Sequence, residues 1–196
     1  GYVYSKGGTD NPRGGVITVS GGAVFNFYSG TMKFPASSTS TTTTGGIVAI
    51  GASTMNMYGG TIEGAALASP TGSASYGAAF RIYDAAGVLN IYGGTITSGT
   101  LPNSKSYAAC GYVGAGGQVT ISGNANVDNI RFAENKNKLI VEGTYTGTAS
   151  VTYPSSTTLD LGTQVGVSKN ATVTGKITCT NNGLLVTAQD DKLVLS

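Results

Sequence analysis

The sequence predicts an all-β fold, a right-handed parallel β-helix (a solenoid) of about four long coils that ends in shorter β-coils or a small β-cap. The first observation behind this prediction is a repeat. Three segments share one template and a fourth keeps its alternation: Phe25–Met32, Met55–Ile62, Leu89–Ile96 and Val119–Gly123. Their starts at 25, 55, 89 and 119 give steps of 30, 34 and 30 residues, a size typical of solenoids.

The second observation is the period within each template. Apolar and polar residues alternate with period two, which indicates a strand and not a helix. The apolar positions are expected to point into the solenoid: Phe25, Phe27, Met55, Met57, Leu89, Ile91, Val119 and Ile121. Gly59-Gly60 and Gly93-Gly94 predict corners, because glycine tolerates positive φ, and Thr-Ile then starts a short strand.

A second extended run precedes each template. These runs are Val16–Val19, Ile47–Ile50, Phe80–Tyr83 and Cys110–Val113. One unit therefore reads strand, bend, strand, corner, short strand and loop, and stacking places like residues about 4.8 Å apart along the axis. An offset of 30 residues aligns Phe80 and Ile82 with Cys110 and Tyr112, which predicts a core position for Cys110.

Composition argues against helices and against isolated units. Thirty-one glycines with abundant Thr and Ser leave no window of helix formers long enough to propagate a helix. Each unit offers about five inward apolar residues, worth roughly 1.5–3 kcal/mol each when buried, against about thirty residues to be ordered. The stack, and not the single unit, is therefore the expected folding unit.

The 30-residue step disappears near residue 137. We therefore predict two parts, the long coils in 1–136 and a C-terminal β-segment in 137–196 that continues or caps them. Shorter alternating runs fill the second part: Leu139–Val141, Ala149–Tyr153, Thr158–Leu161, Ala171–Thr180, Leu184–Thr187 and Lys192–Leu195. The last two flank the turn Gln189-Asp190-Asp191, and such a hairpin would cover the open end of the stack.

Charge and hydropathy exclude several partners. Only 10% of residues are charged, the net charge is +2 and the basic residues are dispersed, so we expect no nucleic-acid binding. No apolar run approaches 18 residues, so we expect no membrane insertion.

The chain begins at Gly1 and not at Met, which leads us to expect a fragment of a larger protein.

The two cysteines, Cys110 and Cys179, fall on apolar alternation positions, which favours two small buried hydrophobic residues. A disulfide between them is the alternative, because sequence cannot say whether their Cβ atoms meet. The chain has no histidine and no CxxC motif, so we expect no metal and no cofactor.

Long insertions recur at one point of the unit, just after the short strand: Pro35–Gly45, Ala65–Gly77 and Gly99–Tyr107. Insertions at equivalent points of a solenoid project from one edge, which is often a binding edge. Tolerated surface variation is the other interpretation.

The nine acids do not converge in the sequence alignment, so we expect no enzyme. Glu63 aligns with Lys33 and Thr97, and Asp84 with Ile50 and Gly114, so neither acid is expected to stack above another. Glycoside hydrolysis needs two carboxylates across a cleft, and a calcium-assisted lyase needs several acids around an ion.

The candidate ligand-binding residues are two outward columns, Tyr28, Tyr58 and Tyr92 beside Asn26, Asn56 and Asn90. Aromatic faces stack against sugar rings and amides bond to hydroxyls, so a glycan or a peptide could lie along them. The alternative is that stacked like residues only stabilise the sheet. A third column contains Thr31, Thr61 and Thr95. Ice-binding faces match a crystal lattice with long, regular threonine arrays, and a column of three coils is too short and irregular for that role.

Two passages, Ala74–Phe80 and Met55–Ile62, resemble the right-handed β-helix repeats of large surface proteins of gut Firmicutes, whose units read like "SYGGGVYV…FTMNGGTISGN". Gln118–Asn124 and Leu161–Val165 also fit the pattern. The likeness covers residues 14 to about 130 well; the long Thr/Ser loops and the tyrosine before Gly-Gly depart from it. No catalytic residues come with the resemblance.

The resemblance implies a secreted, extracellular protein of the bacterial cell surface that acts as an adhesin or carbohydrate-binding module. We therefore expect a non-enzymatic surface module whose partner is a glycan or a host surface protein. A carbohydrate-active β-helix enzyme (a lyase or hydrolase) and a purely structural stalk are the alternatives. No oligomeric state is predicted.

Overall fold

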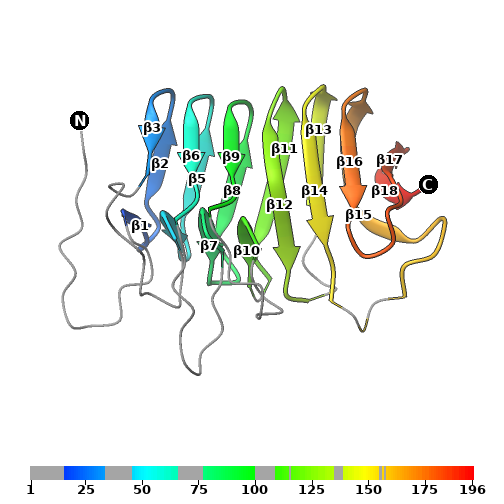
Figure 1. Ribbon diagram of the computed structural model, residues 1–196, viewed down its shortest axis with the longest axis horizontal. Coiled ribbons are helices and arrows are strands. Elements are labelled where there is room, and N and C mark those ends of the chain that lie inside the picture. The colour runs from blue at the N-terminus through cyan, green and yellow to red at the C-terminus, as the bar shows by residue number, and fades with distance from the viewer. Residues whose placement is uncertain are drawn as a thin grey trace.

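The structure is a computed structural model that describes residues 16–33, 46–65, 77–99, 109–114, 116–134, 139–154, 156 and 158–196. Within these ranges the chain forms strands, turns and bends but no helix. The strands lie side by side along the long axis of the molecule and form successive coils (Figure 1). The predicted all-β solenoid of stacked parallel strands is therefore confirmed.

Each N-terminal coil has three strands, which stack on the equivalent strands of the next coil into three walls. The first wall contains β1 (Ile17–Val19), β4 (Val48–Ile50), β7 (Phe80–Ile82) and β10 (Gly111–Val113). The second wall contains β2 (Val24–Phe27), β5 (Thr54–Met57), β8 (Val88–Ile91), β11 (Gln118–Gly123), β13 (Leu139–Tyr145) and β15 (Gln164–Val173). The third wall contains β3 (Thr31–Met32), β6 (Thr61–Glu63) and β9 (Thr95–Thr97).

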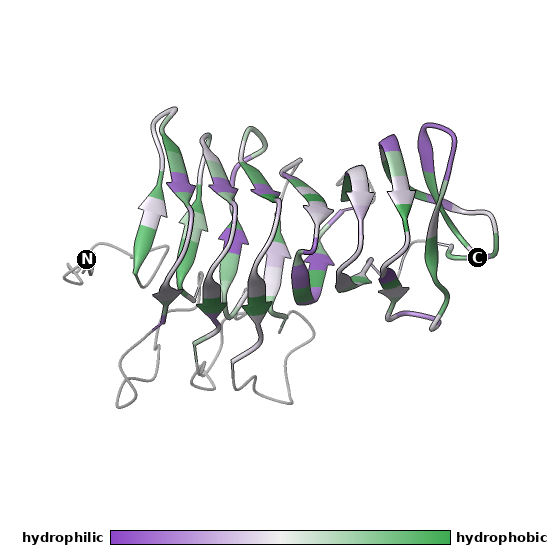
Figure 2. Cartoon of the chain, turned by 90° about the horizontal axis from the view of Figure 1, so that it is seen from above, coloured by the Kyte–Doolittle hydropathy of each residue, from purple (hydrophilic) through white to green (hydrophobic). Residues whose placement is uncertain are grey.

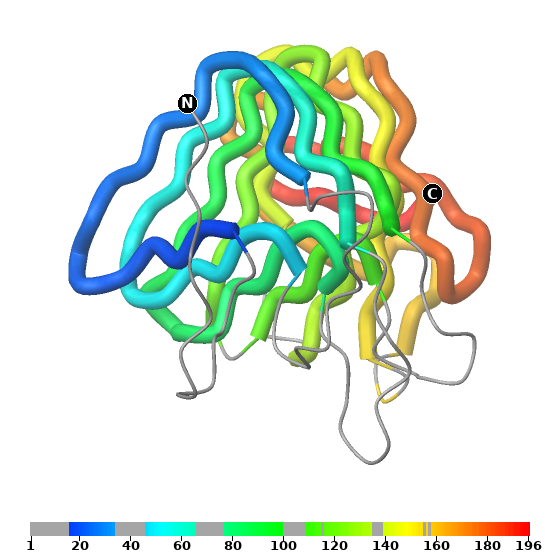
Figure 3. The backbone as a smooth tube through the Cα atoms, turned by 60° about the vertical axis from the view of Figure 1, so that its left-hand side comes forward, coloured from blue at the N-terminus to red at the C-terminus, as the bar shows by residue number. Residues whose placement is uncertain are grey.

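All pairs within the walls are parallel. The pairs among β2, β5, β8 and β11, and among β3, β6 and β9, have the register that the repeat predicts. Phe25 pairs with Met55, and Met55 pairs with Leu89. Seen nearly end-on, the coils nest one behind another (Figure 3). Hydrophobic and hydrophilic residues alternate along the strands (Figure 2), as expected when one face lines the interior and the other meets solvent.

The long strand β12 (Asn126–Phe132) explains why the 30-residue step ends. Its first residues pair with β9 of the third wall, and its last residues pair with β10 of the first wall. In the earlier coils an insertion separates these two walls, whereas here one strand with an irregular register runs through both. The step from Val119 to its partner Leu139 is accordingly only 20 residues.

The C-terminal coils consequently have two strands each. β14 (Thr148–Thr152) pairs with β12 and with β16 (Lys176–Cys179), while β13 and β15 extend the second wall. Pairing therefore continues in both sheets on either side of positions 135–138. The division of the chain at 136/137 into two parts stays a prediction.

A hairpin covers the last coil. β17 (Val186–Gln189) and β18 (Lys192–Leu195) pair antiparallel with each other, and β18 also pairs antiparallel with β15. Asp190 in the turn has φ of 52°. The predicted hairpin is confirmed, but the predicted run Thr158–Leu161 is wrong, because its described residues form no strand and lead into a turn at Gly162 (φ 82°).

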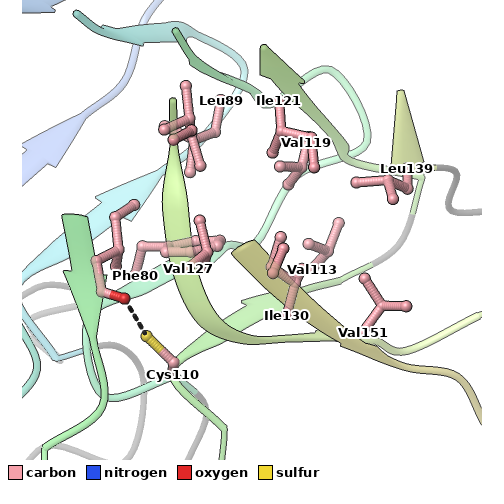
Figure 4. Packing of buried hydrophobic residues seen from close by; sticks show 14 of the residues in the cluster. Phe80, Leu89, Cys110, Val113, Val119, Ile121, Val127, Ile130, Leu139 and Val151 are labelled. Atoms are coloured by element: carbon pink, nitrogen blue, oxygen red, sulfur yellow. Dashed lines mark hydrogen bonds between the residues drawn. The ribbon is translucent and has the colours of Figure 1, made fainter. Parts of the chain in front are cut away.

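Columns of aliphatic and aromatic side chains from all walls fill the interior (Figure 4). The first coil is the exception, since Phe25 and Phe27 pack on the core but stay partly exposed. Both cysteines are buried and free, so they act as small hydrophobic residues and no disulfide joins them. The Cys110 Sγ lies 3.7 Å from the carbonyl oxygen of Ile96.

The predicted alignment of β7 with β10 is wrong by one residue. Gly111, not Cys110, pairs with Phe80, and Tyr112 pairs with Arg81. A Cβ at Gly111 would overlap the Phe80 ring, so glycine here makes room for this fully buried aromatic side chain of the neighbouring coil. Cys110 is nevertheless fully buried, as predicted.

Candidate functional site

The three predicted tyrosines form one ladder at the ends of β2, β5 and β8. The ring centroids of Tyr28 and Tyr58 are 4.9 Å apart with an interplanar angle of 9°, and those of Tyr58 and Tyr92 are 5.1 Å apart at 18°. Main-chain hydrogen bonds fix this register. The Tyr58 amide donates to the carbonyl oxygen of Phe27, and the Tyr92 amide donates to the carbonyl oxygen of Met57, each at 2.8 Å. We call Tyr28, Tyr58 and Tyr92 the tyrosine ladder.

The rings of the ladder cover each other. Exposure falls from 66% at Tyr28 through 46% at Tyr58 to 36% at Tyr92. Because Tyr58 lies between two parallel neighbours, both of its faces are occupied, and it offers solvent mainly ring edge and hydroxyl. A sugar ring therefore cannot stack on Tyr58 as the sequence suggested without parting the rings; the outer face of Tyr28 is the more open surface.

The predicted asparagines lie in the adjacent column and bond to each other. The Asn56 amide nitrogen donates to the Asn26 Oδ1 at 2.8 Å, and the Asn90 amide nitrogen donates to the Asn56 Oδ1 at 2.9 Å. We call Asn26, Asn56 and Asn90 the asparagine ladder. Each link uses one donor and one acceptor, so the side-chain amides keep further capacity toward solvent.

Glycines allow the coils to approach each other at the corner beside the tyrosine ladder. A Cβ at Gly59 would lie 2.8 Å from the carbonyl oxygen of Tyr28, and one at Gly93 would lie 3.0 Å from that of Tyr58. Gly60 and Gly94 adopt φ of 83° and 90°, which other residues rarely accept. The glycine pairs therefore permit the close approach of the coils beside the rings.

Polar residues extend the column beyond the ladder. Ser122 follows Ile121, the partner of Ile91, and its hydroxyl donates to the Glu142 carbonyl oxygen at 2.6 Å. In the register of β13 and β15, Glu142 lies opposite Lys169. Burial raises the pKa of Tyr92 above its ordinary value, with smaller contributions from Tyr58 and the Glu142 carboxylate. Tyr92 is thus uncharged at neutral pH, and an acidic group lies near this end of the ladder.

The sequence missed one relation between acids. Glu63 pairs with Thr97, and Asp128 follows Val127, the partner of Ile96, so the two acids lie on the two strands that flank β9. Each carboxylate already has a contact: Glu63 lies 3.6 Å from the Lys33 ammonium, and Asp128 accepts a bond from the Ser98 amide at 2.6 Å. The prediction that Glu63 stacks on Thr97, and not on another acid, is confirmed.

Asp84 also differs from its predicted alignment. Ile82, two residues earlier, pairs with Ile50 and Val113, so Asp84 lies opposite neither Ile50 nor Gly114. Its carboxylate accepts a bond from the Ala86 amide at 3.0 Å, which is an ordinary turn contact.

The threonine column is in register, since Thr31 pairs with Thr61, and Thr61 with Thr95. It continues into Asn126 and does not form an unbroken threonine array. The three insertions lie almost wholly outside the described residues. Lys33, Ala65 and Gly99 each follow a strand of the third wall, so all three insertions begin at the same point of the coil.

Among the described residues, no group of three or more His, Cys, Asp or Glu side chains is arranged to hold a metal ion. In the same part of the chain, no helix has the length and hydrophobicity to span a membrane. Comparison of the sequence with protein-family models and curated proteins, and of the structure with solved structures, found no match.

Proposed function

We propose that this chain is a non-catalytic binding module of an extracellular bacterial surface protein. In this proposal an extended ligand, a glycan chain or a segment of a host surface protein, lies along the second wall and contacts the tyrosine and asparagine ladders. Ring edges and hydroxyls of the tyrosines make the contact, together with the asparagine amides. The proposal involves no catalytic residue.

One observation carries the proposal. Six large hydrophobic side chains are exposed among the described residues, and four of them, Val24 and the tyrosine ladder, belong to the β2–β5–β8 part of the second wall. Concentrated exposed aromatic surface is typical of interaction sites, because a surface without a partner gains little from keeping such side chains in water. The neighbouring asparagines add directional hydrogen bonding.

A structural stalk is the second candidate, and a specific observation favours it. The rings stack on each other and the asparagines bond to each other, so both ladders stabilise the coils without any ligand. In that case the module is a spacer that extends another part of a surface protein.

Replacing two tyrosines separates these functions. We expect the Tyr58→Ser/Tyr92→Ser double variant to lose binding on a glycan and mucin array while its circular dichroism spectrum stays that of a β-solenoid. The matched control is Thr61→Ser/Thr95→Ser, which alters the third wall of the same two coils. Unchanged binding together with a lower melting temperature would support the stalk.

A further inference from the structure

We propose that the tyrosine ladder is a site of oxidative cross-linking, in which Tyr58 couples to Tyr28 or Tyr92 through a carbon–carbon bond between their rings. The product is a dityrosine that joins neighbouring coils. This modification does not depend on whether the second wall binds a ligand.

Proximity makes the ladder suited to coupling. The centroid distances of 4.9 and 5.1 Å place each pair of rings in contact, and the backbone register holds them there. An intramolecular reaction between groups held together gains the advantage of a very high effective concentration. Rotation about χ1 and χ2, which exposed side chains make on the picosecond to nanosecond timescale, brings the ring edges together.

Accessibility distinguishes the ladder from the tyrosines of the core. The ladder rings are 36–66% exposed, so an oxidant in solution reaches them. Tyr145 and Tyr153 are buried instead, and their hydroxyls donate to the carbonyl oxygens of Ala125 and Val165 at 3.0 and 2.8 Å. We therefore expect the oxidant to act on the ladder and to leave these two tyrosines unchanged.

The reaction balances with a peroxide as oxidant and a haem peroxidase as its catalyst. Each of two phenols loses one electron and its hydroxyl proton to give a phenoxyl radical. The radicals couple at the ring carbons next to the oxygens, and the hydrogen on each of these carbons then moves to oxygen and restores the phenol. Two electrons and two protons in total reduce one hydrogen peroxide to two waters.

The bond would fasten the first described coil to the stack. Phe25 and Phe27 of the first coil are only partly buried, whereas Met55 and Met57 of the second coil are fully buried. A covalent link between Tyr28 and Tyr58 closes the intervening chain into a loop and reduces the entropy that this coil gains on opening.

The test treats the dilute full chain with hydrogen peroxide and horseradish peroxidase and measures dityrosine fluorescence and cross-linked peptides by mass spectrometry. We expect a peptide pair that contains Tyr58 and has lost the mass of two hydrogens. Tyr58→Phe keeps the ring but removes the hydroxyl needed for the radical, so both ladder pairs should disappear and the total signal should fall more than about twofold. Tyr83→Phe, at a partly buried tyrosine after β7, is the matched control and should retain the Tyr58 peptides.

Tyr28→Phe refines the test, because it should abolish one pair and leave the Tyr58–Tyr92 pair. Absence of dityrosine, cross-links that avoid Tyr58, or links only between separate chains would overturn the proposal. So would an undiminished signal in a Tyr58→Phe variant that melts like the parent.

Discussion

The N-terminal and C-terminal coils solve the same stacking problem with different side chains. In the N-terminal coils, identical residues lie above each other and form the tyrosine and asparagine ladders. In the C-terminal coils, Asn129 bonds instead to the hydroxyls of Ser150 and Thr152, and Thr152 bonds to Thr180. Parallel main-chain pairing is therefore common to both regions, and residue identity is not required for stacking.

The two ends of the stack also differ. At the C-terminal end the β17–β18 hairpin brings Leu193 and Leu195 into the core. In the first coil, the described residues leave Phe25 and Phe27 partly exposed. An apolar side chain should accordingly contribute more to stability in the hairpin than in the first coil.

The largest expected effect tests this difference between the ends. Leu193→Ala removes a fully buried side chain and should lower the free energy of unfolding by about 2–5 kcal/mol. Phe25→Ala removes more atoms from a partly exposed position and should cost less than Leu193→Ala, in spite of the larger side chain. Urea unfolding followed by circular dichroism measures both. A greater loss from Phe25→Ala would show that the first coil is buried as well as the hairpin.

The second prediction compares the buried thiols of the two regions. Burial raises the pKa of Cys110 from its ordinary value of 9.0 to about 12. A raised pKa means that the protonated thiol is favoured by the fold, so its contribution is complete below pH 9 and is lost as the pH rises toward 12. Stability should fall already between pH 9 and 10, below the ordinary tyrosine pKa of 10.0.

Chemical unfolding at a series of pH values checks this prediction. The loss between pH 9 and 10 should be smaller in Cys110→Ala than in the parent, with Cys179→Ala as the matched variant of the other buried cysteine. An identical pH profile in Cys110→Ala and the parent would assign the alkaline loss to other groups.

Much of the fold follows from the sequence because each coil of a solenoid repeats the same pattern of apolar, polar and glycine residues. The alternation around Asn56 and Asn90 gives strand, face and register together, and the structure confirms all three. The register of β7 with β10 was not predictable, because the chain between them includes an insertion whose length hides the true offset of 31 residues between Phe80 and Gly111. The shortened step at β12 similarly hid the approach of Glu142 to Tyr92.

The candidate site was predictable as a set of residues but not as a surface. Period two places the tyrosines on one outer column, but it says nothing about side-chain rotamers, which decide that Tyr58 covers its neighbours instead of facing solvent. Asp128 escaped notice for another reason. Val127 pairs with Ile96 through a strand that replaces the usual insertion, and no template marks that strand.

The third prediction compares the asparagine ladder with the C-terminal network. Asn56→Ala removes both ladder bonds, and Asn129→Ala removes the bonds to Ser150 and Thr152; each variant should cost about 1–3 kcal/mol at roughly 0.5–1.5 kcal/mol per bond. Asn26→Ala removes one ladder bond and should cost about half as much as Asn56→Ala. Thermal melts rank the three variants. Equal losses from Asn26→Ala and Asn56→Ala would mean that the ladder bonds are not the cause.

The smallest expected effect concerns the middle ring of the tyrosine ladder. Tyr58→Phe keeps the stacked ring and removes only an exposed hydroxyl, so stability should change by less than about 0.5 kcal/mol. Tyr58→Ser removes two ring contacts, worth about 0.5–1.5 kcal/mol each, and should be clearly destabilising. Thermal melts of both variants give the ring contribution without the hydroxyl. Because Tyr58→Phe is expected to leave the stack intact, any glycan binding or peroxidase cross-linking that it abolishes must depend on the hydroxyl and not on the stability of the coils.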